Sequence, residues 1–334
     1  MKITVLGSGS WGITLSLHLA AAGHSLSLFA SNETKAADLA SRRESVQFLP
    51  GVQIPKTILI TSDLARALER SEGVVFTVPS HGLRTTAQKA AGFWPRGAWA
   101  LSASKGLEEN TLDRMSQILD ECLPPKTRVG VLSGPSHAEE VSKRIPTTVV
   151  VASRDETLCE SIQTAFHADY FRVYTSTDLV GVELGGALKN VIAIAAGILD
   201  GLGLGDNTKA ALMTRGLHEM SRLGVAMGAV AETFSGLTGM GDLMVTCASR
   251  HSRNRLLGEK IGRGLTLEQA LGEMSMVAEG VRTAKAAVEL AEKAGVEVPI
   301  LRQVFEVLYH GKTARESMMD LLSRSAKPER DSNQ

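Results

Sequence analysis

The sequence predicts an α/β fold in which a doubly wound, mostly parallel sheet is followed by an all-α C-terminal domain. Up to about residue 178, short β-branched segments alternate with segments of helical character, which is typical of a parallel sheet with helices on both faces. Beyond that point, apolar residues recur only at helical spacing. A length of 334 residues suits about two domains.

Strands and helices can be assigned in order along the first half. Gly23 ends the first helix and Pro79 ends a buried strand, because glycine favours helix C-termini and proline cannot donate to a strand ladder. Ser62 or Asp63 caps a later helix that runs to residue 70. We therefore expect strands at 2–6, 25–30, 58–60, 73–78, 99–104, 128–132, 147–152 and 171–175, and helices at 10–22, 33–43 and 62–70.

The second half carries helical patterns with a plausible cap or stop at each end. They lie at residues 182–199, 208–223, 266–274 and 281–294. The end of the chain, from residue 327, lacks apolar residues, and chain ends of this kind are usually frayed. We expect domains at residues 1–178 and 179–326 and a disordered tail at 327–334.

Composition and charge exclude several classes of protein. Hydrophobic residues make up 43%, and Lys+Arg and Asp+Glu are balanced at 36 each, so the chain is not wholly disordered. The zero formal net charge argues against a general nucleic-acid binder or a polybasic membrane clamp. We expect no nucleic-acid partner.

Cysteine usage and the chain start suggest a cytoplasmic protein. Cys122, Cys159 and Cys247 lie far apart, without a Cys-x-x-Cys pair, which argues against a disulfide framework or a structural zinc site. We expect no metal. The first residues run directly into a strand pattern, which leaves no room for a signal peptide. The apolar run at 191–199 is too short to span a bilayer, so we expect no stable membrane insertion.

A glycine motif follows the first predicted strand. Gly7, Gly9 and Gly12 form Gly-x-Gly-x-x-Gly at the start of the first predicted helix. In that context the glycines permit a tight turn and close approach of a pyrophosphate, which free N–H groups at the helix start bind. An ordinary glycine-rich turn is the alternative. We expect a Rossmann-like domain that binds NAD(P).

The choice between NAD and NADP is left open by the second strand. An acidic residue at its end is typical of NAD sites, and a nearby arginine of NADP sites. Ser31 and Asn32 stand there instead, and Glu33 comes one step late. Ser31 and Asn32 suit a ribose hydroxyl or a 2′-phosphate. Arg42 and Arg43 lie further on, where a solvated helix face is the simpler interpretation.

Polar residues follow the next strands. Lys105 comes directly after the strand at 99–104, and the carboxyl end of a parallel strand faces the ligand crevice; a surface lysine is the alternative. Gly134 begins a turn after the strand at 128–132, and Ser136 then caps a helix and leaves N–H groups free. Capping alone would also explain Ser136.

Lys189 and Asn190 stand out in the most apolar helical segment. They are the only polar pair between Gly185 and Leu199. Gly185 and Gly186 precede them, although a glycine inside a helix costs about 1 kcal/mol relative to alanine. Such glycines usually indicate close approach of another backbone or a ligand. Lys189 is therefore either functional or a snorkelling side chain.

Two further segments of the second half suit a substrate. Asp242 lies in a glycine-rich turn, where a turn role is the alternative. Ser252, Arg253 and Asn254 begin a basic helix, and a helix start beside an arginine is a good phosphate site. A plain capped helix is the competing interpretation.

Together these residues suggest a reductase. Reducing a ketone puts negative charge on its oxygen, which a lysine ammonium such as that of Lys189 stabilises and protonates. Burial and a second cation such as Lys105 would lower its pKa. The sequence therefore predicts NAD(P)-dependent reduction of a small phosphorylated or acidic ketone.

The order of the motifs resembles that of the bacterial NAD(P)-dependent sn-glycerol-3-phosphate dehydrogenase family. The likeness runs from Lys2 to about Ala326. Its motifs are Gly-Ser-Gly-Ser-Trp-Gly at 7–12, Phe-Leu-Pro-Gly at 48–51, Val-Pro-Ser-His at 78–81, Ser-Lys-Gly at 104–106, Leu-Ser-Gly-Pro-Ser at 132–136, Leu-Gly-Gly-Ala-Leu-Lys-Asn at 184–190, Thr-Gly-Met-Gly-Asp-Leu at 238–243, Ser-Arg-Asn-Arg at 252–255 and Val-Ala-Glu-Gly at 277–280.

The resemblance implies reversible interconversion of dihydroxyacetone phosphate and sn-glycerol 3-phosphate, a precursor of membrane phospholipids. It also implies a cytoplasmic homodimer, a C-terminal domain like that of 6-phosphogluconate dehydrogenase, and a preference for NADPH over NADH. Lys189 would be the proton donor and acceptor. Substrate contacts would come from Lys105, Gly134, Ser136, Lys189, Asp242, Ser252, Arg253 and Asn254, and cofactor contacts from Gly7, Gly9, Ser10, Trp11, Gly12, Lys105, Ala138, Arg253, Val277 and Glu279.

This chain departs from the family pattern at two places. Ser31 and Asn32 stand where many members have Arg or His, and His137 replaces an aromatic neighbour of the Ser136 hydroxyl. Other hypotheses are a β-hydroxyacid dehydrogenase, whose substrate carries a carboxylate, a non-catalytic NAD(P)H sensor, and a helical half that serves only dimerisation.

Overall fold

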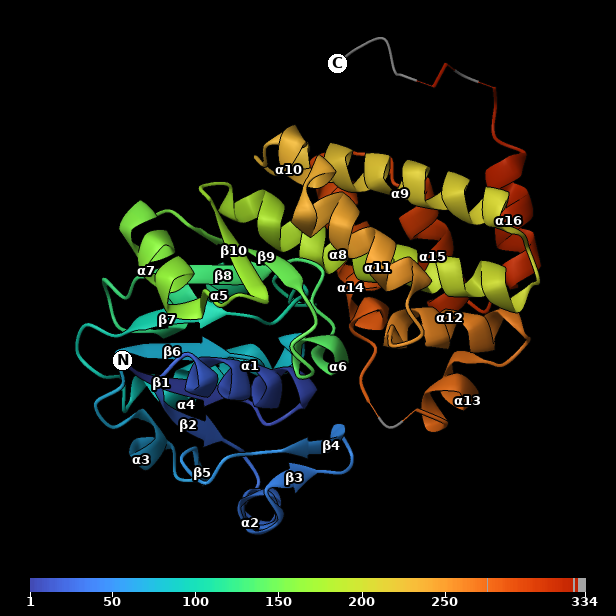
Figure 1. Cartoon of the computed structure of the whole chain (residues 1–334). Coiled ribbons are helices and arrows are strands. Elements are labelled where there is room, and N and C mark those ends of the chain that lie inside the picture. The colour runs from blue at the N-terminus through green and yellow to red at the C-terminus, as the bar shows by residue number, and fades with distance from the viewer. Residues whose placement is uncertain (275, 327, 330–334) are drawn as a thin grey trace.

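The computed structural model describes residues 1–274, 276–326, 328 and 329. Two lobes lie side by side (Figure 1). The α/β lobe runs to the last strand, which ends at Ser176, and the helical lobe begins with the helix that starts at Leu179. Within the described residues, no strand follows Ser176. The predicted α/β class with an all-α C-terminal part is confirmed.

The α/β lobe is built on an eight-stranded sheet in the order β10-β9-β8-β7-β6-β1-β2-β5. Neighbouring strands pair in parallel, except that β8 and β9 are antiparallel. The sheet is therefore mostly parallel, as predicted. Its strands are β1 (Lys2–Leu6), β2 (Ser25–Phe29), β5 (Leu59–Thr61), β6 (Gly73–Phe76), β7 (Trp99–Ser102), β8 (Val129–Ser133), β9 (Thr147–Ser153) and β10 (Phe171–Ser176).

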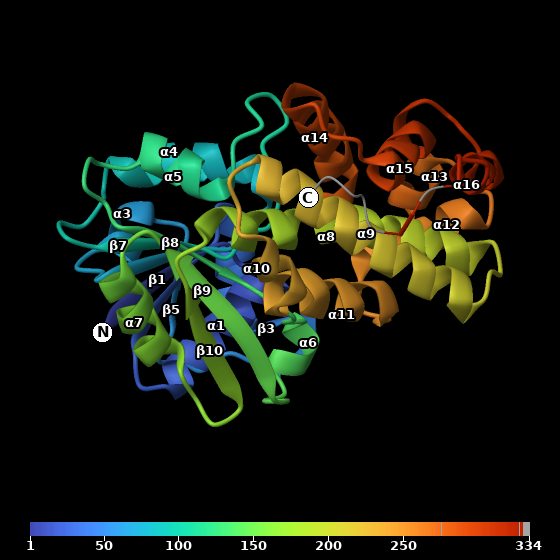
Figure 2. The same ribbon diagram turned by 90° about the horizontal axis from the view of Figure 1, so that it is seen from above.

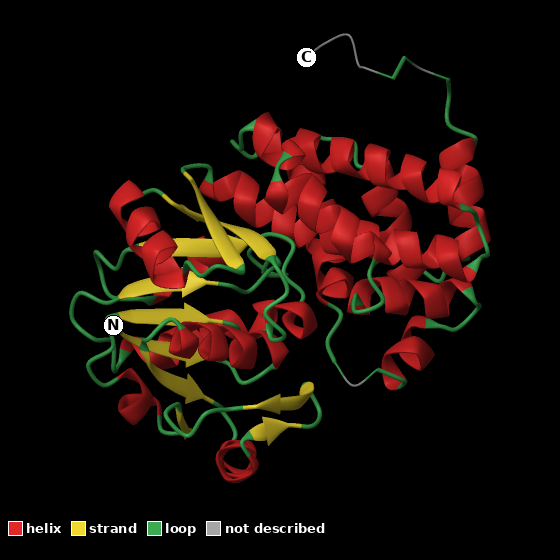
Figure 3. Ribbon diagram, viewed as in Figure 1, coloured by secondary structure: helices red, strands yellow, loops and turns green. Residues whose placement is uncertain are grey.

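Helices cover both faces of this sheet (Figures 2 and 3). Apolar side chains of α1 and α7 share one core with the sheet, and those of α3, α4 and α5 share another, because a buried parallel sheet needs cover on each face. The helices are α1 (Ser10–Ala21), α2 (Glu33–Arg42), α3 (Leu64–Leu68), α4 (Leu83–Ala91), α5 (Met115–Cys122), α6 (Ala138–Val141) and α7 (Glu156–Phe166).

Some elements of this lobe were not predicted. The helices α4, α5 and α7 each have an amphipathic pattern that we did not assign. A small antiparallel pair, β3 (Glu44–Ser45) and β4 (Leu49–Gln53), also went unassigned. Its strands are short, and Pro50 and Gly51 interrupt the alternation by which a strand is usually identified.

The helical lobe is arranged around α8 (Leu179–Gly201), which is buried along nearly its whole length. The other elements are α9 (Asp206–Ala226), α10 (Ala231–Ser235), the π-helical turn η2 (Leu237–Gly241), α11 (Asp242–Ala248), α12 (Arg253–Gly262), α13 (Leu267–Gly272), α14 (Glu279–Ala294), α15 (Pro299–Tyr309) and α16 (Ala314–Leu322). The predicted helices at 182–199, 208–223, 266–274 and 281–294 fall on α8, α9, α13 and α14.

Glycines bring α8 and α12 into backbone contact. A Cβ atom on Gly197 would lie 1.9 Å from the carbonyl oxygen of Arg255, and one on Gly258 would lie 2.0 Å from that of Ile194. Gly201 and Gly262 repeat the arrangement one turn further on, at 2.3 Å and 2.4 Å from backbone oxygens. Larger residues would force the two helices apart.

The helix α8 is longer and more continuously apolar than expected. It has 23 residues and a mean hydropathy of 1.6, which is enough to cross a membrane by length and composition alone, and its apolar window is entirely buried inside the protein. The expectation of a short apolar run was wrong, because the residues before Lys189 continue the apolar pattern. The burial is that of a core helix. The expected tail at 327–334 lies largely outside the described residues.

Candidate active site

The glycine motif forms a tight loop between β1 and α1. Gly7 has a φ of +123°, and a Cβ atom there would lie 2.7 Å from the Thr77 hydroxyl oxygen. A Cβ atom on Gly12 would lie 1.9 Å from the carbonyl oxygen of Gly7. The Thr77 hydroxyl donates to the Gly7 carbonyl at 3.1 Å. Gly7 and Gly12 are therefore required by the turn and by helix–strand packing.

Gly9 differs from these two glycines because no atom lies within 4 Å of the position of its Cβ atom. It precedes α1 without a side-chain cap, so no side chain of Gly9 competes for the first N–H groups of the helix. Ser10 is buried, and Trp11 packs beside the core of the lobe. An uncapped helix start beside a glycine fits the pyrophosphate of a dinucleotide.

The polar residues after β2 are only partly available to a cofactor. The Asn32 side chain accepts from the Lys35 N–H at 2.9 Å and so caps α2. Ser31 and Glu33 are exposed. Arg42 pairs with Asp38 at 2.6 Å, and the Arg43 guanidinium donates to the Ile58 carbonyl at 2.8 Å. Arg42 thus lies on a solvated helix face, as the simpler interpretation has it, whereas Arg43 is partly buried and held by backbone carbonyls.

Side chains from both lobes meet around Asp242. The Lys189 ammonium of α8 donates to Oδ1 of Asp242 at 2.9 Å, and the Lys105 ammonium donates to Oδ2 at 2.7 Å. Lys189 also donates to the Thr246 hydroxyl at 2.6 Å, and Lys105 to the carbonyl oxygen of Gly134 at 3.0 Å. We call Lys105, Lys189, Asp242 and Thr246 the lysine–aspartate cluster.

Burial sets the protonation of this cluster. Asp242 is 2% exposed and the Lys189 side chain 8%. Burial lowers the pKa of Lys189 to about 8; the Asp242 carboxylate opposes this, and the Lys105 charge adds to it. Burial works against the charged form of Asp242, but the two ammonium groups outweigh it and hold the pKa of Asp242 below its usual value. Lys189 is therefore suited to exchange a proton near neutral pH.

The helical glycines before Lys189 make room for the cluster. A Cβ atom on Gly186 would lie 2.5 Å from the Ser133 hydroxyl oxygen and 3.6 Å from Cδ of Lys105. A Cβ atom on Gly185 would lie 2.7 Å from the carbonyl oxygen of Thr238. Gly185 thus meets another backbone, as the sequence suggested, whereas the atoms that approach Gly186 belong to side chains.

The expected phosphate segment lies at the start of α12. Ser252 caps this helix by accepting from the Arg255 N–H at 3.2 Å. The side-chain NH2 group of Asn254 donates to Oδ1 of Asn190 at 2.9 Å, and the side-chain Oδ1 of Asn254 accepts from the Gly280 N–H at 2.9 Å. Asn254 thus ties α12 to the helix that carries Lys189, and Ser252 has a capping role.

Glu279, at the start of α14, reaches back to the α/β lobe. Its carboxylate accepts from the N–H and the hydroxyl of Ser80, at 3.2 Å and 2.5 Å. Just before it, the carbonyl oxygen of the half-exposed Val277 accepts from the Arg253 guanidinium at 3.2 Å. This segment therefore joins the loop after β6 to the start of α12.

The loop after β8 holds the remaining expected residues. Gly134 has a φ of +128°, and the Ser136 hydroxyl donates to its carbonyl oxygen at 3.0 Å. Ala138 is buried, and its carbonyl oxygen accepts from the Thr14 hydroxyl of α1 at 3.3 Å. The Gly134 oxygen is thus shared by Ser136 and by Lys105 of the cluster.

Sequence reasoning missed Thr246 and noted His137 only as a departure from the family pattern. Thr246 stands four residues after Asp242 on one helix, a spacing that places two side chains on the same face and was available as a signal. His137 lies close enough that burial, followed by the Lys189 charge, lowers its pKa to about 4. Its ring centroid is 6.1 Å from that of His251. Because His251 is far from His137 in the sequence, their proximity could not be predicted from the sequence.

Comparison with known proteins covers nearly the whole chain. Two family descriptions match it: the N-terminus of NAD-dependent glycerol-3-phosphate dehydrogenase over residues 2–159, and the C-terminus of the same enzyme over residues 178–319. A glycerol-3-phosphate dehydrogenase [NAD(P)+] of Citrifermentans bemidjiense is 50% identical over 330 residues, which is 98% of each chain. One of Chlorobium limicola is 49% identical over 331 residues, 98% of this chain and 99% of its own.

A solved structure gives the same result. The crystal structure of glycerol-3-phosphate dehydrogenase from Coxiella burnetii has a TM-score of 0.93 and 33% sequence identity, and the match covers 97% of this chain and 99% of that one. The matched regions include the glycine loop and every member of the lysine–aspartate cluster. The chain belongs to the NAD-dependent glycerol-3-phosphate dehydrogenase family.

Proposed function

We propose that this protein catalyses the reversible, NAD(P)H-dependent reduction of dihydroxyacetone phosphate to sn-glycerol 3-phosphate. The observation that carries the proposal is the buried Lys189 ammonium, which is held by Asp242 and Thr246 at the junction of the two lobes. Relatives that are 50% identical over nearly the full length carry the same activity in their names. A buried lysine with a lowered pKa is the group that such a carbonyl reduction requires.

The cofactor is NAD or NADP, held by the glycine loop. The uncapped start of α1 beside Gly9 binds the pyrophosphate, and Ser10, Trp11 and Ala138 line the site together with Gly7 and Gly12. When bound, the nicotinamide supplies or accepts the hydride. Neither an acidic side chain nor an arginine stands at the end of β2, so the slight preference for NADPH rests on the family resemblance.

Lys189 donates the proton in the reduction. As the carbonyl carbon receives the hydride, negative charge grows on its oxygen, and the ammonium stabilises that charge and then protonates it. With a pKa of about 8, Lys189 is mostly charged at neutral pH and therefore ready to donate. In the oxidation, its neutral amine takes the proton of the substrate hydroxyl, so that direction needs a higher pH.

Lys105 and Asp242 position the reacting group. Asp242 keeps both ammonium groups in place through separate carboxylate oxygens, at 2.7 Å and 2.9 Å. Lys105 brings a second positive charge from the other lobe and contacts both substrate and cofactor. The Gly134 carbonyl and the Ser136 hydroxyl lie on the same loop and bind the hydroxyl end of the substrate. The carbonyl oxygen accepts a hydrogen bond from it, and the Ser136 hydroxyl donates one to it.

The phosphate of the substrate binds at the start of α12. Arg253 supplies the charge, and free N–H groups of the first turn, together with Ser252 and Asn254, complete the site. Arg253 also contacts the cofactor, as do Val277 and Glu279. The Ser80–Glu279 contact supports this arrangement because it keeps the start of α14 against the α/β lobe.

The wider assignments are proposals as well. We propose that residues 1–178 form the NAD(P)-binding domain and residues 179–326 the substrate domain. We further propose that the protein is a homodimer in the cytoplasm and that its product supplies glycerophospholipid synthesis. The burial of the apolar window of α8 supports a protein without membrane insertion.

Initial rates test the function and the cofactor preference together. The purified protein should oxidise NADPH with dihydroxyacetone phosphate, more slowly with NADH, and should not act on hydroxyisobutyrate. In the reverse direction it should reduce NADP+ with sn-glycerol 3-phosphate but not with its mirror image. Turnover of hydroxyisobutyrate at a rate similar to that of sn-glycerol 3-phosphate would contradict the proposal.

A further inference from the structure

A groove with a volume of about 290 Å³ opens between α8, α9, α15 and α16, within the helical lobe. Its described lining runs from Ala195 to Arg324 and includes no residue of the glycine loop or of the lysine–aspartate cluster. The groove is therefore separate from the candidate active site. Its volume is near the lower end of the range for small-molecule sites.

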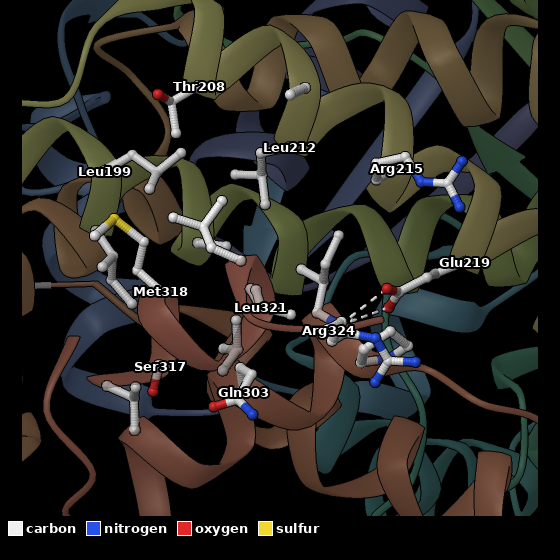
Figure 4. Close-up of a pocket in the computed structure, with 18 of the residues that line it drawn as sticks. Leu199, Thr208, Leu212, Arg215, Glu219, Gln303, Ser317, Met318, Leu321 and Arg324 are labelled. Atoms are coloured by element: carbon white, nitrogen blue, oxygen red, sulfur yellow. Dashed lines mark hydrogen bonds between the residues drawn. The ribbon is translucent and has the colours of Figure 1, made fainter. Parts of the chain in front are cut away.

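The two ends of this groove differ in chemistry (Figure 4). Aliphatic side chains, among them Leu199, Leu212 and Met318, lie at one end, whereas Arg215, Glu219 and Arg324 lie at the other. Apolar surface that remains open to water is costly and often marks a binding site. A ligand that covers it must itself be apolar at one end and polar at the other.

The charges at the polar end favour an anion. The described lining holds Arg215, Arg222 and Arg324 together with the carboxylates of Glu219 and Glu297, and the Arg222 guanidinium is engaged, donating to the backbone carbonyl of Glu297 at 3.1 Å. Arg324 pairs with Glu297 at 3.0 Å. Arg215 donates to the backbone carbonyl of Glu329 at 3.2 Å, and no carboxylate of the described residues forms an ion pair with it.

Glu219 offsets this positive charge only in part. It is 4% exposed, and its two oxygens accept from the Ile300 N–H at 2.9 Å and 3.0 Å and from the Leu301 N–H at 3.3 Å. The carboxylate thus caps the start of α15. Burial raises the pKa of Glu219 to about 7, so part of its population is neutral near pH 7 and repels an incoming anion less.

We propose that this groove binds a single-chain anionic amphiphile: an unbranched alkyl chain lies along the aliphatic end, and a carboxylate or phosphate head group binds to Arg215. The guanidinium matches either head group with two parallel hydrogen bonds. Each methylene that leaves water adds a fixed increment to the binding free energy. Affinity therefore rises with chain length until the groove is filled.

Calorimetric titration of the full-length protein tests this site without depending on its enzymatic activity. The probes are dodecanoate and dodecyl phosphate below their micelle concentrations, with inorganic phosphate and dodecyltrimethylammonium as controls. At least one anionic probe should bind with a stoichiometry of one per chain, also with saturating NADPH present, and the tighter of the two identifies the head group. Equal binding of the cationic probe would overturn the proposal.

Matched variants place the site. Arg215→Glu should weaken binding of the anionic probe at least tenfold, whereas Arg96→Glu, on an exposed loop of the α/β lobe, should leave it unchanged. Leu212→Trp fills the aliphatic end and should abolish binding. If Leu212→Trp does not fold, the Arg215→Glu comparison still decides, because unchanged affinity in that variant excludes the site. NADPH affinity should be unaltered in both arginine variants.

Discussion

The glycine loop and the lysine–aspartate cluster are built in opposite ways. The loop uses backbone from one continuous segment, and Gly7, Gly9 and Gly12 suit it because they have no side chain. The cluster uses side chains from distant parts of the chain, with Lys105 in one lobe and Lys189 in the other. A backbone site therefore fails when an atom is added, and a side-chain site fails when one is removed.

The largest effect should come from removing the lysine ammonium. Lys189→Ala should lower kcat at least ~100-fold, the usual scale for general acid–base catalysis. The variant loses the proposed proton donor, and no other described ammonium group lies in contact with both Asp242 and Thr246. NADPH binding, measured by fluorescence titration, should be unchanged. Lys293→Ala, an exposed lysine of the same lobe, serves as the control. Near wild-type turnover of Lys189→Ala would refute the assignment.

Adding one methyl group tests the loop. The added methyl group of Gly9→Ala meets open space in the protein itself, so Tm should be unchanged. The methyl group stands where the pyrophosphate approaches, so it should weaken NADPH binding roughly tenfold, about 1.4 kcal/mol. Gly12→Ala instead collides with the Gly7 carbonyl and should lower Tm. Equal Tm losses in the two variants would mean that Gly9 is needed only for folding.

A smaller effect should follow from removing the proposed phosphate contact. Arg253→Ala should raise the KM for dihydroxyacetone phosphate several-fold, the scale of one partly exposed charged hydrogen bond, with kcat nearly unchanged. Steady-state kinetics at fixed NADPH measures both. Arg263→Ala, at the other end of α12, is the matched control. An unchanged KM would favour a helical lobe without substrate contacts.

The smallest effect concerns pH. Because the pKa of Lys189 is lowered to about 8, kcat/KM for the reduction should fall as the pH rises through that value, and kcat/KM for the oxidation should rise. Lys105→Met removes a positive charge that disfavours the Lys189 ammonium, so the inflection should move to higher pH. Initial rates from pH 6 to 10 measure it. An inflection that moves to lower pH would contradict this electrostatic coupling.

The comparison also explains how far the sequence alone could lead. The glycine loop is local, so its spacing predicted both its position and its ligand. Three members of the cluster, Lys105, Lys189 and Asp242, were predicted from their sequence context and from the family resemblance, whereas Thr246 was missed. Gly185 and Gly186 indicated a close approach, but which atoms approach, the Thr238 carbonyl and the Ser133 hydroxyl, depends on contacts between segments far apart in the sequence.

Other features gave no sequence signal. The antiparallel pairing of β9 with β8 is a choice between two directions that the same β-branched pattern allows. Ser252 and Asn254 were predicted as ligands; the Ser252 cap was the alternative that the sequence offered, whereas the hydrogen bonds of Asn254 to Asn190 and Gly280 form only when α8, α12 and α14 are packed together.

The glycine-to-backbone contact of α8 with α12 has a consequence for the geometry of the proposed active site. Helices that touch through their main chains have little freedom to slide or rotate, so α8 and α12 keep a constant register. Lys189 on α8 and the proposed phosphate site at the start of α12 are therefore held at a constant spacing within one rigid pair of helices. Lys105 belongs to the other lobe, so it is the member of the lysine–aspartate cluster whose position depends on how the α/β lobe packs against this pair.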